Sequence, residues 1–203
     1  MKSSSIHQSL PTHRSQLIGP FTLAVLAVIS QVVGIEILAY DQLAIIEGEY
    51  WRLLTANLVH TNYAHLAMNL GGLFALWLLH GDEYKTQNYL GIALTCGLAI
   101  TLAIYLLREN ITWYVGLSGI LHGIFVWGLV KDFEKRRASA WLLAAGLVLK
   151  LVIELQTGGS AWVEAMLGAR IVVDAHLYGA IAGGFFAITA MALKRQRNNS
   201  LTS

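Results

Sequence analysis

Six long apolar stretches dominate this 203-residue chain and limit what it can fold into. Each approaches the length of about 20 residues that a helix needs to cross the hydrocarbon core of a bilayer. Since lipid offers the backbone no hydrogen-bonding partners, such stretches are expected to be helices and not strands. The chain is therefore predicted to be an all-α membrane protein built as a bundle of six transmembrane helices. The predicted spans cover residues 17–40, 58–80, 89–107, 114–130, 138–155 and 171–193.

Composition supports this fold class and limits the chemistry. Charged residues make up 13% of the chain, about half the fraction of a soluble domain. The single cysteine, Cys96, excludes a disulfide within the chain and a cysteine-based metal site. No obvious repeat or long linker divides the sequence, so one membrane domain is expected at residues 17–193. A disordered cytoplasmic N-terminus is predicted at residues 1–16 and a basic cytoplasmic tail at residues 194–203.

The distribution of basic residues predicts the orientation. With six spans, one side of the membrane holds both termini and the second and fourth loops, and the positive-inside rule makes this side cytoplasmic. The expected location is the inner membrane of a bacterium, with the odd-numbered loops facing the periplasm. The basic cluster at residues 131–137 is interpreted as a contact with anionic lipid, not as a nucleic-acid site. Ten basic residues fall on the cytoplasmic side (Lys2, Arg14, Lys85, Lys131, Lys135, Arg136, Arg137, Lys194, Arg195 and Arg197) and three on the other (Arg52, Arg108 and Arg170).

Polar residues inside spans are costly in lipid and are usually functional. They gather at the start of the second, fourth and sixth predicted spans, in residues 60–69, 116–123 and 174–183. Even-numbered spans run from the outside inward, so the three clusters lie at a similar depth. We therefore expect them to form one site near the outer surface.

Ser118 and His176 are the candidate catalytic pair of this site. Ser118 precedes Lys131 by thirteen residues, which puts it about 20 Å above the cytoplasmic boundary and about 10 Å below the outer surface. His176 comes out somewhat shallower, by a turn or so. A histidine within reach can take the serine hydroxyl proton and make the oxygen a nucleophile.

Glycines on both helices predict that they pack closely. Small residues spaced four apart let helix backbones approach each other in lipid. Taken alone, they indicate helix packing and nothing more, but such packing would bring Ser118 within hydrogen-bond range of His176. The pairs are Gly119 and Gly123 on the fourth span, and Gly179 and Gly183 on the sixth.

The second predicted span supplies candidate donors for an oxyanion. His65 and Asn69 are four residues apart and share a helix face, and the backbone N–H of Ser118 is a third donor. The alternative is that His65 and Asn69 form a polar clamp between helices. His60 is five residues from His65 and is predicted to face elsewhere, as a structural residue that caps or ties the first loop.

These motifs resemble those of the rhomboid intramembrane serine proteases. The matches are His-x4-His-x3-Asn at residues 60–69, Gly-x-Ser-Gly at Gly116–Gly119 and Ala-His-x2-Gly-x3-Gly at Ala175–Gly183. Trp51-Arg52 also resembles a pair in the first outer loop of that family. The three motifs occur in the right order, in alternate spans and at matching depth.

The resemblance implies a rhomboid-like bundle with Ser118 as nucleophile and His176 as general base. His65, Asn69 and the Ser118 N–H would form the oxyanion site, and no metal or other cofactor is expected. His122 stands where rhomboids commonly have an aromatic residue, and we expect it to stack on His176 or to hydrogen-bond to it.

A compact six-span rhomboid with a short first outer loop and the motif Gly-Leu-Ser-Gly-x-Leu-His-Gly, found here at residues 116–123, is similar to the rhombosortase branch. That branch is paired with exported proteins whose C-terminal tail carries Gly-Gly, an apolar span and a basic end. The expected partners are therefore single-span membrane proteins with a basic cytoplasmic tail, within the lipid bilayer.

Other polar residues are assigned structural roles. Lys150 and Glu154 form an i,i+4 pair in the fifth span, and a buried ion pair is favoured over a place beside the substrate. Asp174 is two residues before His176 and is expected to point elsewhere, so no catalytic triad is predicted.

Three other functions remain open. A membrane haem or metal protein could use His65, His122 and His176 as ligands, but the serine motif would then go unexplained. A catalytically inactive rhomboid relative could act as a binding protein, although the presence of both Ser118 and His176 argues against it. A small transporter has neither an inverted repeat nor a broken helix to support it.

Overall fold

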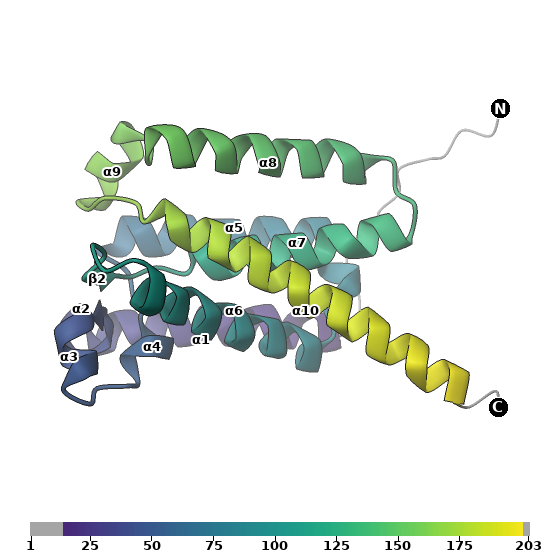
Figure 1. The fold of residues 1–203 in the computed structure, drawn as a ribbon, viewed down its shortest axis with the longest axis horizontal. Helices are drawn as coiled ribbons and strands as arrows, with labels where there is room; N and C mark the ends of the chain where they lie inside the picture. The colour runs from purple at the N-terminus through teal and green to yellow at the C-terminus, as the bar shows by residue number, and fades with distance from the viewer. Residues whose placement is uncertain (1–13, 201–203) are drawn as a thin grey trace.

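The structure is a computed structural model that describes residues 14–200. Short strands β1 and β2 pair antiparallel, and the other regular elements of the described chain are helices. The predicted disordered N-terminus falls mostly outside the described residues, which begin with α1. The elements, most of them labelled in Figure 1, are α1 (Arg14–Val33), α2 (Ile35–Leu38), β1 (Tyr40–Asp41), α3 (Gln42–Ile46), α4 (Arg52–Thr55), α5 (Tyr63–His80), the 3-10 turn η1 (Gly81–Glu83), α6 (Thr86–Leu107), β2 (Trp113–Tyr114), α7 (Ser118–Glu134), α8 (Ser139–Thr157), α9 (Ala161–Leu167) and α10 (Val173–Ser200).

Long helices lie at all six predicted spans. Among the described helices, α1, α6, α8 and α10 are long and apolar enough to cross a membrane by length and composition. The other two, α5 and α7, have 18 and 17 residues and carry the polar residues of the predicted site. A mainly helical protein with four candidate membrane spans is therefore confirmed, while six crossings and the orientation of the termini remain predictions.

Two helix ends differ from the predicted boundaries. α1 stops at Val33 because Gly34 adopts a φ of 108°, a conformation that favours glycine and breaks the helix. The predicted first span to Tyr40 is therefore interrupted. At the other end of the chain, α10 runs past Leu193 to Ser200, so the predicted basic tail is helical through that residue.

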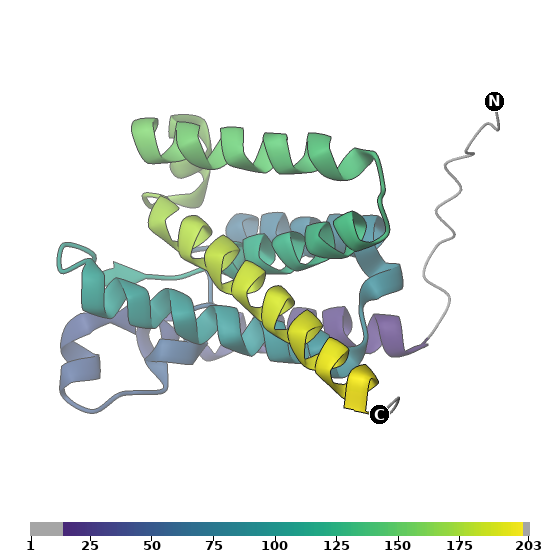
Figure 2. The same cartoon turned by 45° about the vertical axis from the view of Figure 1, so that its right-hand side comes forward.

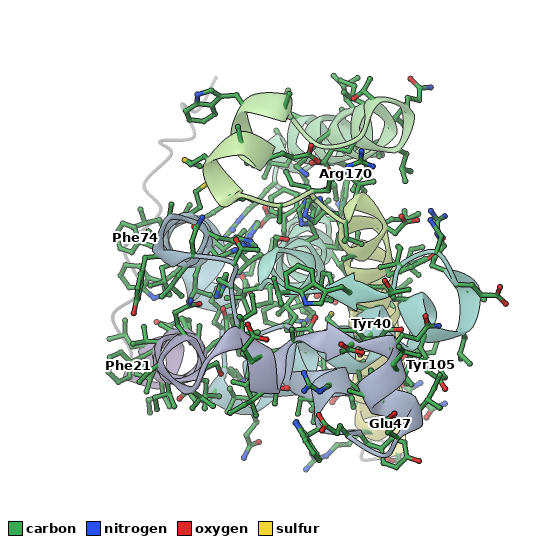
Figure 3. All side chains as sticks on the ribbon, turned by 90° about the vertical axis from the view of Figure 1, so that its left-hand side faces the viewer. Phe21, Tyr40, Glu47, Phe74, Tyr105 and Arg170 are labelled. Atoms are coloured by element: carbon green, nitrogen blue, oxygen red, sulfur yellow. The ribbon has the colours of Figure 1, made fainter. Side chains whose placement is uncertain are left out.

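The short elements α2, α3, α4, β1, β2 and α9 lie together at one end of the bundle (Figure 1). Figure 3 looks onto this end, with Arg170 beside α9 and Glu47, just after α3, at the opposite edge. Buried Arg52 holds the first outer loop by donating to the carbonyl oxygens of Ala39 at 2.8 Å and Glu36 at 2.9 Å. The loop is therefore a folded cap and not a simple connection.

Helix α7 packs against α10 through the predicted glycines. A Cβ added at Gly179 would collide with the backbone carbonyl of Gly119, and one added at Gly183 would collide with that of Gly123. The backbones of α7 and α10 therefore meet directly at these positions, the arrangement that the spacing of the glycines indicates.

Helix α8 lies apart from the other long helices, as both Figure 1 and Figure 2 show. Among the described residues of α8, only Ala140 is buried, while Trp141 and Leu142 are about three-quarters exposed. Phe21 of α1 and Phe74 of α5 are also exposed and lie at the outer rim of the bundle in Figure 3. Apolar surface of this extent is typical of a protein whose surroundings are lipid.

Charged residues form a network at the opposite end of the bundle. Lys135 and Arg137, between α7 and α8, form ion pairs with Asp82 and Glu83 of η1. Partial burial alone would raise the pKa of Asp82, but hydrogen bonds and positive charge from Arg137 and Lys135 outweigh burial and lower it. The basic cluster at residues 131–137 therefore has acidic protein partners, in addition to the anionic lipid that the sequence suggests.

Replacing Gly179 by valine is expected to lower the thermal unfolding midpoint of the detergent-purified protein. The new side chain would meet the backbone of Gly119, which cannot move aside as a side chain can, and overpacking typically costs about 1–3 kcal/mol. Gly71→Ala in α5 is the matched control, because a Cβ there has nothing within 4 Å. A midpoint of Gly179→Val equal to that of Gly71→Ala would show that the contact between α7 and α10 is not tight.

Candidate active site

The starts of α5, α7 and α10 bring the predicted polar clusters together. Ser118 is the first residue of α7, and His176 lies in the first turn of α10. His65 and Asn69 occupy the first two turns of α5, which begins after Asn62 because the Asn62 side chain accepts the His65 N–H at 2.8 Å as an N-cap. The side chains at Ser118, His176, His65 and Asn69 all line one cavity.

Ser118 and His176 are in direct contact. The Ser118 Oγ lies 2.9 Å from His176 Nε2, a normal hydrogen-bond distance, and His176 is buried. For the hydroxyl to donate, Nε2 must carry a lone pair, so the ring proton must sit on Nδ1. This is the arrangement in which an imidazole can take a proton from serine.

His122 lies one turn after Ser118 and stacks on His176. The two ring centroids are 4.3 Å apart, with their planes at 16°. The His122 Nδ1 donates to the carbonyl oxygen of Ser118 at 2.7 Å, since a carbonyl can only accept. Of the two contacts expected from the sequence, the structure therefore contains the stack, and the hydrogen bond from His122 goes to Ser118 and not to His176.

Glu154 of α8 contacts the far side of the His176 ring. Its Oε2 lies 2.8 Å from His176 Nδ1 and accepts from Lys150 Nζ at 2.6 Å. The predicted ion pair is present, but its interpretation as purely structural is incomplete, because it adjoins the candidate catalytic histidine. The sequence does hold one signal for the contact with His176, because Glu154 lies near the outward end of its predicted span, close to the depth of the predicted site. Asp174 pairs with Arg108 at 3.0 Å and so points elsewhere, as expected.

Three hydrogen-bond donors border the cavity near Ser118. The Ser118 N–H is at the start of α7, where helices leave N–H groups without an intrahelical partner and where the helix dipole is positive. Asn69 Nδ2 donates one hydrogen to the carbonyl of His65 at 3.2 Å, which leaves its second amide hydrogen. The His65 ring contacts Thr61 through Nδ1 at 3.2 Å and keeps Nε2 available. The arrangement can donate hydrogen bonds to an oxygen that develops negative charge.

Gly116 makes room for His65. Its φ of 119° favours glycine, and a Cβ at this position would contact the His65 ring. The turn is held by the Gly116 N–H, which donates to Ala56 at 3.0 Å, and by the Tyr114 hydroxyl, which donates to the Gly116 carbonyl at 2.9 Å. In the Gly-x-Ser-Gly motif, Gly116 thus shapes the turn and Gly119 admits α10.

The cavity at Ser118 has a volume of about 290 Å³. Apolar side chains such as Met68, Trp113 and Val163 form much of its lining, and the polar groups converge at Ser118 and His176. A pocket with mostly apolar walls and a few convergent polar groups is typical of a binding or catalytic site.

The sequence predicts that His60 faces away from His65, and the structure corrects this. The two rings pack edge to face, with centroids 4.9 Å apart at 88°. Helical spacing does not apply, because His60 precedes the cap residue Asn62 and lies outside α5. Its backbone N–H donates to Gln31 of α1 at 3.0 Å, so this residue does tie the loop to the bundle.

The hypothesis of a metal protein requires a cluster of ligands, and residues 14–200 contain one cluster of three potential ligands. His122, Glu154 and His176 offer ligand atoms that lie within 4.8 Å of one another. Both ring nitrogens of His176 are already hydrogen-bonded, and the Lys150 ammonium beside Glu154 supplies positive charge where a cation would sit. The chemistry of these groups therefore favours proton transfer over metal binding.

Comparison with known proteins identifies a matching family and two relatives. The Rhomboid domain family matches residues 47–193. The chain is 26% identical over 157 residues to the rhomboid protease GluP of Bacillus subtilis. The matched segment makes up 77% of this chain but only 29% of the much longer GluP. The chain is 25% identical over 156 residues to the putative rhomboid protease YdcA of the same organism, which covers 76% of this chain and 74% of that one. Because the family match extends over most of the chain and includes every residue at the cavity, this protein belongs to the rhomboid family.

Proposed function

We propose that this chain is an intramembrane serine endopeptidase with Ser118 as nucleophile and His176 as general base. The observation that carries the proposal is the 2.9 Å contact between Ser118 Oγ and His176 Nε2 at the wall of a cavity. Membership of the rhomboid family supports it, since the two relatives are named as a protease and a putative protease.

The chemistry begins when His176 Nε2 takes the hydroxyl proton of Ser118 and Oγ bonds to the carbonyl carbon of the scissile peptide. The carbonyl π electrons move onto its oxygen, which accepts hydrogen bonds from the Ser118 N–H, His65 and Asn69. When the carbonyl re-forms, the C–N bond breaks and His176 gives its proton to the leaving nitrogen. Water, or an amine in its place, then bonds to the acyl carbon and loses a proton to His176. The bond from that carbon to Ser118 Oγ breaks, and His176 returns the proton to Oγ, which restores the Ser118 hydroxyl.

The proposed substrate is the transmembrane C-terminal tail of an exported single-span protein, of the Gly-Gly type that rhombosortases take. The proposal of a helical substrate is supported by an apolar groove of about 480 Å³ between α5, α7 and α8. This groove shares His122 and Lys150 with the catalytic cavity. A helix hides its carbonyls in its own hydrogen bonds, so the cleaved segment must unwind before Ser118 can attack. Glycine eases this step, because it disfavours a helix by about 1 kcal/mol relative to alanine.

We assign the active site to the periplasmic side of a bacterial inner membrane. The turn between α7 and α8 and the end of α10, which hold six of the fourteen lysine and arginine residues, lie at the end of the bundle opposite α9 and β2 (Figure 1). The positive-inside rule then makes the basic end cytoplasmic, and the cavity opens at the other end.

Ser118→Ala and His176→Ala are each expected to abolish cleavage of a single-span reporter while the protein still accumulates in the membrane. Residues that act as one unit are not additive, so the double variant should be no worse than either single variant. Ser139→Ala, at the other end of the bundle, should cleave at the wild-type rate, as should wild type treated with a chelator. Substantial cleavage by Ser118→Ala would contradict a serine mechanism.

His122→Tyr is expected to keep most activity, and His122→Ala to lose about two- to tenfold. The reason is that an aromatic pair contributes about 0.5–1.5 kcal/mol beyond its buried area, and tyrosine can preserve the stack on His176. The initial rate of reporter cleavage, normalised to folded protein, measures this. Full activity in His122→Ala would mean that the ring only fills space.

Replacing a Gly-Gly pair near the outer end of the substrate span with Leu-Leu is expected to slow cleavage about tenfold or more, because both residues then favour the helix. The same Leu-Leu pair placed near the cytoplasmic end of the span is the control and should leave the rate unchanged. Equal cleavage of all three reporters would contradict the Gly-Gly specificity while leaving the serine mechanism standing.

A further inference from the structure

Glu154 and Lys150 are charged residues that line the cavity at Ser118 but have no part in the proposed mechanism. Both lie on α8, yet Glu154 reaches the ring of His176 on α10. One oxygen, Glu154 Oε2, lies 2.8 Å from His176 Nδ1 and 2.6 Å from Lys150 Nζ. The Glu154 side chain is 17% exposed and that of Lys150 is 43% exposed, so the carboxylate is the more buried member of the pair. A charge held inside a membrane bundle is costly, which calls for a role.

We propose that Glu154 is a positioning residue that completes a Ser118–His176–Glu154 triad, with Lys150 as the counter-ion of its carboxylate. The inference rests on the proposed function of Ser118 and His176. The carboxylate stays ionised throughout and moves no proton. Its part is to hold the imidazole in one orientation and one tautomer, as the acidic member of a serine protease triad does.

Glu154 is needed to set the tautomer of His176. A carboxylate can only accept, so its contact requires the ring proton on His176 Nδ1 and leaves the Nε2 lone pair for the Ser118 hydroxyl. The Lys150 ammonium lies 3.5 Å from the same Nδ1 and can only donate. Without the carboxylate, Lys150 would favour the opposite tautomer, in which Nε2 carries the proton and cannot act as a base.

The stacking of His122 on His176 does not set the tautomer of the His176 ring. His122 stacks on His176 but directs its Nδ1 proton to the Ser118 carbonyl, so it fixes the plane of the ring and not its proton. Glu154 and His122 are therefore complementary, the first acting on the tautomer of His176 and the second on its tilt.

The test uses the full-length protein in detergent and measures how fast an alkyl fluorophosphonate labels the nucleophilic serine, together with kcat and KM for the Gly-Gly reporter. Glu154→Gln keeps the size of the side chain and should slow labelling and kcat by about 10²- to 10⁴-fold, since loss of the acid in a serine protease triad costs up to about 10⁴. KM and the thermal midpoint should stay near wild type. Glu154→Asp, which keeps the carboxylate, should recover much of the rate.

Two further variants separate positioning from simple stabilisation. Glu134→Gln breaks a Lys–Glu pair of the same 2.6 Å length at the far end of α7 and should label at the wild-type rate. Lys150→Met/Glu154→Gln removes the competing donor as well, so it should label faster than Glu154→Gln by about tenfold. Imidazole ¹⁵N NMR of His176 should report the Nδ1–H form in wild type and its loss in Glu154→Gln.

The outcomes distinguish the inference from the function on which it rests. Wild-type labelling rates in Glu154→Gln, with no labelling of Ser118→Ala, would overturn the triad and leave the dyad mechanism intact. Equal losses in Glu154→Gln and Glu154→Asp, accompanied by lower thermal midpoints, would reduce Glu154 to a structural ion pair and also overturn it. Absence of labelling in the wild type itself would remove the serine nucleophile and the triad together.

Discussion

The backbone contact between α7 and α10 is the constraint on which the site depends. Ser118 and His176 are 58 residues apart in the chain, and each lies in the first turn of its helix. Their side chains are short, so they can hydrogen-bond only if the two helix backbones nearly touch. Gly119 and Gly179 permit this because a Cβ on either would collide with the facing backbone. Since lipid supplies little hydrophobic drive between helices, this close packing both stabilises the bundle and sets the geometry at Ser118.

A membrane interior also requires that polar groups find partners within the protein. At this site Asn69 donates to the His65 carbonyl, His122 donates to the Ser118 carbonyl, and Lys150 donates to Glu154. Helix α8 is peripheral in Figure 1, and the Glu154 contact is a polar link from it to α10. The hydrogen bonds that satisfy buried groups are therefore the same ones that orient the candidate catalytic side chains.

Sequence reasoning predicted the features that depend on nearby residues, such as depth along a helix. It did not predict contacts that depend on the packing of another helix. Of the predicted site residues, Ser118, His176, His65, Asn69 and His122 do line one cavity, because depth along a helix follows from counting residues to the nearest charged boundary. Glu154 was assigned to a structural pair because Lys150, four residues earlier, already explains its charge. Its contact with His176 depends on how α8 is rotated about its axis, which no pattern within α8 encodes. His60 was misplaced for a related reason, since its orientation follows from where the Asn62 cap starts α5.

The sequence by itself determined that the chain is a membrane protein, where its six long helices lie to within a few residues, and that Ser118, His176, His65 and Asn69 lie at a similar level. These properties follow from apolar length and from 1.5 Å of rise per residue, both of which are local. Only the tertiary structure decided that Ser118 meets His176 at 2.9 Å, that His122 stacks on that ring, and that Glu154 approaches it from α8. Those contacts join three helices, α7, α8 and α10. They depend on the rotation and crossing of each helix, which are set by packing between segments that are distant in the chain.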